Sequence, residues 1–140
     1  MRILSRVLWF SLLCLTLCSC SNHKIQHAAR LYFERGDVNA SDTLFVDIKE
    51  VVGKDFDECF IIQGMCLEQD ISEIIGTSFS GHYIADDECS IVLLKDKTVI
   101  YQERVPWRKI ESDVNDFVVN PQLYFILKNG RLCLKVYVQQ

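Results

Sequence analysis

One short polar loop contains the residue types that most resemble a set of catalytic side chains. Ser78 and Ser80 lie in the stretch 76–81, His82 follows it and Asp86 comes soon after. A hydroxyl, an imidazole and a carboxylate form the triad of serine hydrolases, which is recognised by geometry and not by order along the chain. The loop lacks the G-x-S-x-G spacing of a nucleophile elbow and is expected after a helix, not between a strand and a helix. A solvated polar loop explains it more simply, so we assign no catalytic residue and keep a serine hydrolase as the alternative.

Histidines and acids elsewhere offer little more to a metal ion. His23 and His27 are four residues apart, a spacing that places both rings on one face of a helix, but no third ligand is near. The acidic run 86–88 lacks the ligand periodicity and turn glycine of an EF-hand. Solvated surfaces explain both features, so the sequence predicts no metal site, no cofactor and no enzymatic activity.

Four cysteines follow the first 20 residues: Cys59, Cys66, Cys89 and Cys133. An even number of thiols in an oxidising compartment favours disulfides, and four cysteines allow three connectivities. Buried reduced thiols are one alternative. Zinc is another, although Cys-x6-Cys lacks the short spacing of structural zinc sites. If one pair is chosen, Cys59 with Cys89 is favoured, because each follows a similar Asp-Glu pair that could begin one of two neighbouring strands.

A tryptophan beside an arginine is the candidate interaction site. Trp107 and Arg108 follow Pro106, which should end a strand and present both side chains on a loop. Tryptophan and arginine are enriched in the energetic centres of protein interfaces. A half-buried core tryptophan is the alternative interpretation.

The N-terminus indicates export. Arg2 and Arg6 precede an apolar run from Val7 to Leu17, which is shorter than the roughly 20 residues that a membrane-spanning helix needs. A short positive region, an apolar core and small residues are typical of a secretory signal. Without residues 1–19, 13 basic and 19 acidic residues leave a formal charge of −6. An acidic domain has no electrostatic surface for nucleic acid, and nothing suggests polybasic attraction to lipid headgroups.

The end of this leader, Leu17-Cys18-Ser19-Cys20, resembles the lipobox of bacterial lipoproteins. In that family the cysteine is diacylglycerated, the leader (here residues 1–19) is cut before it, and the new amine is acylated with a fatty acid such as palmitate. Cys14 and Cys18 each follow a leucine, which is too large for the position before the cut. The resemblance implies a lipid anchor at Cys20 and a tether of residues 20–22. Ser21 is not the aspartate that retains such proteins at the inner membrane, so the outer membrane, facing the periplasm, is preferred and the inner membrane is the alternative.

Residues 23–140 should form a single α+β domain. Apolar spacing predicts helices over 23–36 and 67–76, with Gly36 and Gly76 as stops. Residues 43–53 fit a helix or a strand, and a helix is favoured. Strands are predicted at 58–64, twice within 89–105 and twice within 123–138, where Asn129-Gly130 is typical of a type I′ hairpin. We expect one mainly antiparallel sheet of about five strands with two or three helices packed on one face.

Two similar stretches suggest one exception to antiparallel pairing. "DECFII" at 57–62 and "DECSIV" at 87–92 are thirty residues apart, enough for a strand, a helix and a parallel strand over 58–94. Cys59 and Cys89 would then begin neighbouring strands. Coincidence between two strand starts is the alternative.

Residues 47–106 resemble a group of small bacterial lipoproteins of uncharacterised function. The shared order is an aromatic-Asp pair (Phe56-Asp57), an apolar strand ("CFII"), a helix ending in Ile-Gly ("DISEIIG") and a strand pair ("SIVLLKDKTVIYQERVP"). Phe56 replaces the group's usual tryptophan, and "GMCLEQ" replaces its Pro-Tyr-Thr. The resemblance implies structure and no active site. We therefore expect a non-enzymatic, lipid-anchored envelope protein that binds another envelope protein, in assembly, stress signalling or inhibition; small-ligand binding is a further alternative.

Overall fold

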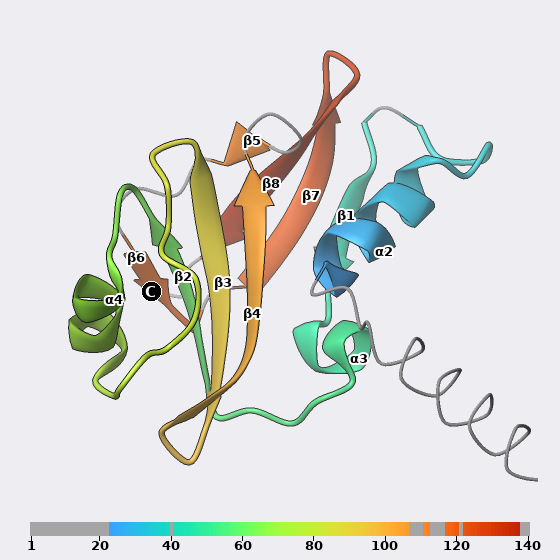
Figure 1. Cartoon of the computed structure of the whole chain (residues 1–140). Coiled ribbons are helices and arrows are strands. Elements are labelled where there is room, and N and C mark those ends of the chain that lie inside the picture. The colour runs from blue at the N-terminus through green and yellow to red at the C-terminus, as the bar shows by residue number, and fades with distance from the viewer. Residues whose placement is uncertain (1–22, 40, 107–110, 113–116, 121, 138–140) are drawn as a thin grey trace, which may run out of the picture.

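The computed structural model is an α+β protein with three helices and two β-sheets in the residues that it describes, 23–39, 41–106, 111–112, 117–120 and 122–137 (Figure 1). Sheet A has the strand order β1-β7-β8-β5, and sheet B has the order β4-β3-β2-β6. Neighbouring strands are antiparallel except β5 and β8, which are parallel. In chain order the elements are α2 (Lys24–Phe33), β1 (Thr43–Val46), α3 (Ile48–Val52), β2 (Glu58–Gln63), α4 (Glu68–Ile75), β3 (Glu88–Lys95), β4 (Thr98–Pro106), β5 (Glu111–Ser112), β6 (Phe117–Val119), β7 (Gln122–Lys128) and β8 (Arg131–Tyr137).

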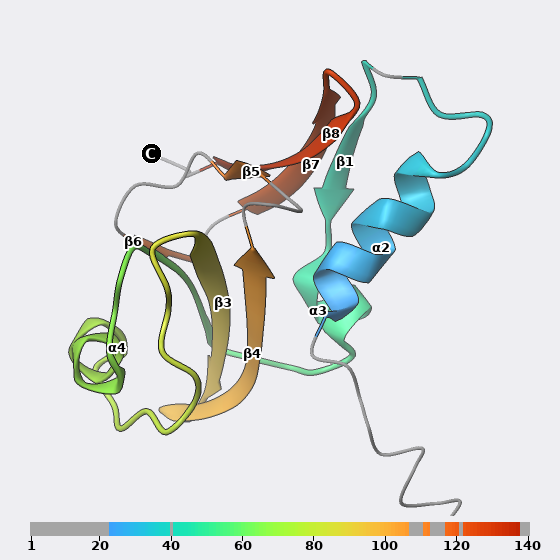
Figure 2. The same ribbon diagram turned by 45° about the horizontal axis from the view of Figure 1, so that its top comes forward.

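Sheet B is buried on both faces. Alternate residues of β2 point to opposite sides, so Ile61 joins one apolar cluster and Phe60 and Ile62 join another. The first cluster also contains side chains of sheet A, α2 and α3, and the second contains side chains of α4. Figure 2 shows the same layering, with α4 on one side of sheet B and α2 and α3 on the other.

Local signals fix the ends of several elements as the sequence predicts. Helix α4 begins where the Asp70 carboxylate accepts the Leu67 N–H at 2.8 Å, and it ends at Gly76, whose φ of 69° suits glycine. Asn129 and Gly130 have φ angles of 54° and 73° between β7 and β8, as a type I′ turn requires. The predicted hairpin at 123–138 and the predicted helix at 67–76 are therefore confirmed.

The prediction of one sheet of about five strands with helices on one face is wrong in its layering. The central strands β2 and β3 are apolar on both sides, and each side must be covered. A second sheet together with α2 and α3 covers one side, and α4 covers the other. The strands β1, β5 and β6 are additional to the five predicted strands, and they enlarge the two sheets to four strands each.

The parallel unit predicted for 58–94 is also wrong, because β2 and β3 are antiparallel. Helix α4 has eight residues, so it extends only about 12 Å. The chain then returns beside its outward path, where Cys66 and Ile84 form an antiparallel bridge. Strand β3 consequently starts beside the end of β2, with Cys89 opposite Gln63.

Residues 43–53 contain both structures that their pattern allowed. Strand β1 covers Thr43–Val46, and Asp47 then caps α3 by accepting the Glu50 N–H at 3.1 Å. Gly53 ends this short helix with a φ of 71°. The preference for one continuous helix is wrong because the aspartate side chain starts a new helix directly after the strand.

Candidate functional site

Three residues singled out in the sequence lie outside the described residues. They are the predicted lipidation site Cys20 and the predicted interaction pair Trp107 and Arg108. They stay predictions, and the described part of the chain supplies the site geometry below.

Three of the four cysteines lie in the two sheets, and Cys66 lies between β2 and α4. Cys59 lies opposite Leu93 in the β2–β3 register and Cys89 lies opposite Gln63, which separates the two cysteines by roughly 13 Å along the strands. The structure therefore does not bring together the pair that the sequence favoured. Burial raises the pKa of the Cys59 thiol to about 12.

The other two cysteines occupy different surroundings. Cys66 is half-buried, and burial, assisted by the Asp70 carboxylate, raises the pKa of its thiol. Cys133 is buried on β8, opposite Ile126 of β7. Cys59 and Cys89 thus share one apolar cluster on neighbouring strands, while Cys133 lies in the other sheet.

The loop with the serine–histidine set is held by its backbone. Ser78, Ser80 and His82 are all exposed. The His82 N–H donates to Gln102 Oε1 at 3.1 Å, and its carbonyl accepts from Gln102 Nε2 at 3.0 Å. Within the described residues the His82 ring makes no hydrogen bond to either serine, so this structure does not assemble the candidate triad.

A buried carboxylate fastens the first helix to sheet B. Glu103 of β4 is fully buried, and its Oε2 and Oε1 accept the backbone N–H groups of Ile25 and Gln26 at 3.0 and 2.9 Å. The Gln26 amide also donates to Oε1 at 3.0 Å, and the Tyr101 hydroxyl donates to Oε2 at 2.5 Å. A negative charge is favourable at the N-terminus of a helix, where backbone N–H groups lack partners. Glu103 thus fixes α2 from a strand that lies far away in sequence.

The same interaction changes the acidity of its neighbour. Burial raises the pKa of Tyr101 above its usual range, and the hydrogen bond to the Glu103 carboxylate raises it further. Tyr101 also accepts the Lys24 N–H at 3.3 Å. The tyrosine therefore stays a neutral donor to Glu103.

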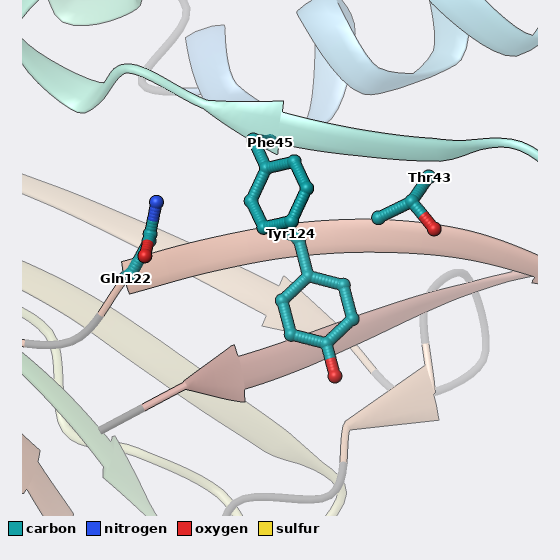
Figure 3. Close-up of a pocket in the computed structure, with 4 residues that line it drawn as sticks. All are labelled: Thr43, Phe45, Gln122 and Tyr124. Carbon is teal, nitrogen blue, oxygen red and sulfur yellow. The ribbon is translucent and has the colours of Figure 1, made fainter. Parts of the chain in front are cut away.

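The outer face of sheet A carries an aromatic pair in which Phe45 is exposed and Tyr124 is half-buried (Figure 3). Phe45 of β1 and Tyr124 of β7 are directly opposite in the strand register, and their ring centroids are 5.6 Å apart at an interplanar angle of 38°. The Phe45 side chain is 60% exposed, although it is large and apolar. Thr43 and Gln122 lie to either side, and the four residues line a hollow of about 620 Å³.

The inner face of sheet A is different. Leu123 and Phe125 alternate with Tyr124 along β7 and are fully buried in the core between the sheets. Helix α2 lies beside β1 in both overall views, so the accessible part of β1 is its outer face (Figures 1 and 2). The Phe45 ring is therefore held on the sheet and presented to solvent, with the half-buried Tyr124 ring beside it.

Sequence reasoning missed this pair. The signal was the alternation of Thr43 and Phe45 with Leu44 and Val46, which places the phenylalanine on the polar side of a strand. The same residues also fit a helix, and the preference for that helix concealed the alternation.

Comparisons with known proteins identify no relative: no protein-family model, curated protein or solved structure matches the chain. Among the described residues, no cluster of three or more histidine, cysteine or acidic side chains is arranged to hold a metal ion. No helix in the same part of the chain has the length and apolar character needed to cross a membrane.

Proposed function

We propose that this is a non-enzymatic, lipid-anchored envelope protein that binds another envelope protein through the outer face of sheet A. The observation that carries the proposal is the exposed Phe45 ring, packed against the half-buried Tyr124 ring beside a hollow. Large exposed aromatics gathered on one surface are typical of interaction sites.

The lining of the hollow defines the chemistry of the partner. Two aromatic rings supply apolar contact area, while Thr43, Gln122 and the Tyr124 hydroxyl supply hydrogen-bonding groups at its rim. A branched or aromatic side chain of the partner would displace water from the rings, and a neighbouring backbone group would bond to the rim. This combination of an apolar centre and a polar edge is that of a protein interface.

The exposed site is small, which favours a short-lived complex. A contact confined to the four described lining residues would bury far less than the roughly 1,200–2,000 Å² of a stable protein interface. An anchor that confines the protein and its partner to one surface compensates for weak contacts by raising their effective concentration. The proposed anchor at Cys20 and the small site therefore fit together.

The path of the chain after the proposed anchor supports this arrangement. Helix α2 begins at Lys24, directly after the predicted tether of residues 20–22, and Glu103 fastens that helix to the sheets. The domain would consequently stay close to the membrane, with the outer membrane facing the periplasm as the preferred location and the inner membrane as the alternative.

The anchor is tested by the intact mass of protein extracted from membranes with detergent, after unfolding in guanidinium chloride and alkylation of all free thiols without reduction. A mass of residues 20–140 plus acyl groups is expected. A mass that retains the leader would overturn the anchoring proposal. The number of alkyl groups on the protein tests the predicted disulfides in the same spectrum.

The binding face is tested with a photo-crosslinking amino acid placed at Phe45 in cells. The matched control is Tyr83, which is 57% exposed and lies on the loop between α4 and β3. We expect one discrete crosslinked envelope protein from position 45 and none of the same mass from position 83. Identical products from both positions, or none from position 45, would count against sheet A as the binding face.

A further inference from the structure

A second hollow lies at the edge of sheet B, where three separate segments meet. It has a volume of about 210 Å³ and is lined by His23 before α2, His82 of the loop before β3, and Gln102 and Arg104 of β4. All four side chains are polar, and three of them are basic types. The fold thus brings together two histidines 59 positions apart in the sequence, which no sequence pattern indicated.

The side-chain amides of Gln26 and Gln102 already make hydrogen bonds within the protein. The basic side chains are therefore the donors available to a ligand in the hollow. The Gln102 amide is used by the His82 backbone and by Ser90 Oγ, to which its Nε2 donates at 3.0 Å. The Gln26 amide nitrogen lies 3.2 Å from His23 Nδ1. Both hydrogens of this amide are already used, by Glu103 Oε1 at 3.0 Å and by the Arg104 carbonyl at 2.8 Å. A neutral imidazole carries one N–H in either tautomer, so His23 has a donor even without a positive charge.

Arg104 supplies the permanent positive charge. Its Nη1 lies 3.7 Å from the Glu88 carboxylate, which is buried on the adjacent strand and also accepts the Ala85 N–H. A guanidinium has five N–H donors in a planar fork, so this contact leaves several for a ligand. A metal cation would be repelled by the guanidinium, and the described lining residues, all polar, suit a polar ligand better than an apolar one.

We propose that this hollow binds a tetrahedral oxyanion of the phosphate class, held by His23, His82 and Arg104. A water molecule occupies about 30 Å³ in the liquid, so a hollow of about 210 Å³ has room for such an anion and several waters. His23 is three residues beyond Cys20, a span of at most about 11 Å. If the proposed anchoring at Cys20 holds, the phosphate of a lipid headgroup is within reach; free phosphate is the other source.

The test is a titration of the full mature protein in maltoside micelles, which contain no phosphate. Sodium sulfate is added at constant ionic strength against sodium chloride, and the ring resonances of the chain's three histidines are followed by NMR. His23 and His82 should shift together along one saturable curve. His27, which is exposed one helical turn beyond His23, is the internal control and should not shift.

Variants of two arginines separate a specific site from general attraction. Arg104→Gln should weaken sulfate binding at least tenfold, because it removes the charged donor. Arg35→Gln, which removes a guanidinium that forms an exposed ion pair with Asp37, should leave the curve unchanged. Equal shifts at all three histidines, no shift at His23 and His82, or an unchanged curve for Arg104→Gln would overturn the proposal.

A second arm identifies the source of the anion. Phosphatidylglycerol added to the same micelles should shift the same two rings and weaken sulfate binding if a headgroup phosphate is the ligand. If free anions are the ligand, the lipid should leave the sulfate curve unchanged. The sulfate titration does not depend on acylation, so failure of the anchor, seen in the intact mass, is distinguishable from failure of the anion site.

Discussion

Replacing Glu103 by glutamine should lower the free energy of unfolding by about 2 kcal/mol. The substitution keeps the shape of the side chain but removes its charge and one of its two acceptor oxygens. Both bonds to Oε1 come from Gln26, whereas Oε2 accepts from the Ile25 N–H and the Tyr101 hydroxyl. The effect depends on which oxygen the new amide group replaces.

The less costly orientation puts the –NH₂ group in place of Oε2. The Tyr101 hydroxyl can rotate and accept from it, but the Ile25 N–H can only donate and loses its partner. An unsatisfied buried N–H costs about 1–3 kcal/mol, and loss of the charge at the helix N-terminus costs about 0.3–1 kcal/mol more. Relief of the desolvation of a buried carboxylate offsets part of this sum, which leaves the estimate of about 2 kcal/mol.

Urea unfolding followed by circular dichroism measures the change. The matched control is Glu73→Gln on the exposed face of α4, which should change stability by less than about 0.5 kcal/mol. A spectrophotometric titration of Tyr101 supplies a second readout: its pKa should fall in Glu103→Gln and still stay raised, since burial is the larger cause. Equal stability of the two variants, with no change in the tyrosine titration, would refute the role given to Glu103.

Three further predictions concern packing, acid stability and thiol reactivity. Gly81→Ala should destabilise the fold by about 1–3 kcal/mol in thermal denaturation, because a Cβ there would overlap a buried ring and an amide oxygen, whereas Gly36→Ala meets nothing within 4 Å. Hydrogen bonds to two lysines lower the pKa of Asp55 from 3.8 to about 2. Its contribution to stability is therefore present above about pH 4 and is lost as pH falls through about 2. A carboxyl NMR titration of Asp55 with a midpoint near 4 would contradict this. In the native protein at pH 8, alkylation should modify Cys66 well before Cys59, because Cys59 is 2% exposed and its thiol has a pKa of about 12. Peptide mass spectrometry measures both rates of alkylation, and equal rates would count against the burial of Cys59.

Local structure could be predicted where one short stretch of sequence determines it. The Asn129–Gly130 turn and the helix that ends at Gly76 depend on backbone conformations that few residues adopt, and both were predicted correctly. Residues 43–53 failed because two patterns overlap there. Leu44, Val46 and Ile48 alternate as in a strand, while Leu44, Ile48 and the pair Val51/Val52 share a helical face. The side chain of Asp47 decided between them by capping the helix.

Long-range pairing could not be predicted, because it depends on contacts that no local pattern records. The return of the chain after α4 makes β2 and β3 antiparallel, and it follows from the length of one helix and one bridge at Cys66 and Ile84. The role of Glu103 had a local signal, since it lies between the buried residues Tyr101 and Val105 on the inward side of β4. Its partner, the start of α2, is 77 residues away and had no signal at all.

The outer face of sheet A and the basic hollow suit different ligands. The outer face of sheet A is apolar at its centre and suits a protein side chain, while the basic hollow between α2 and β4 suits an anion. Glu103 affects the second surface, because it holds the helix that follows His23 against the strand that carries Arg104. Loss of Glu103 should therefore disturb the anion site more than the aromatic pair.

The central claim is that Phe45 and Tyr124 form the centre of a partner-binding site. The most direct test is the affinity of the purified protein for the partner identified by crosslinking, measured for Phe45→Ala and for the control Tyr83→Ala. The account predicts a loss of about 2 kcal/mol, roughly 30-fold in Kd, for Phe45→Ala and less than about twofold for Tyr83→Ala. Equal affinities for the two variants, with both proteins folded, would contradict it.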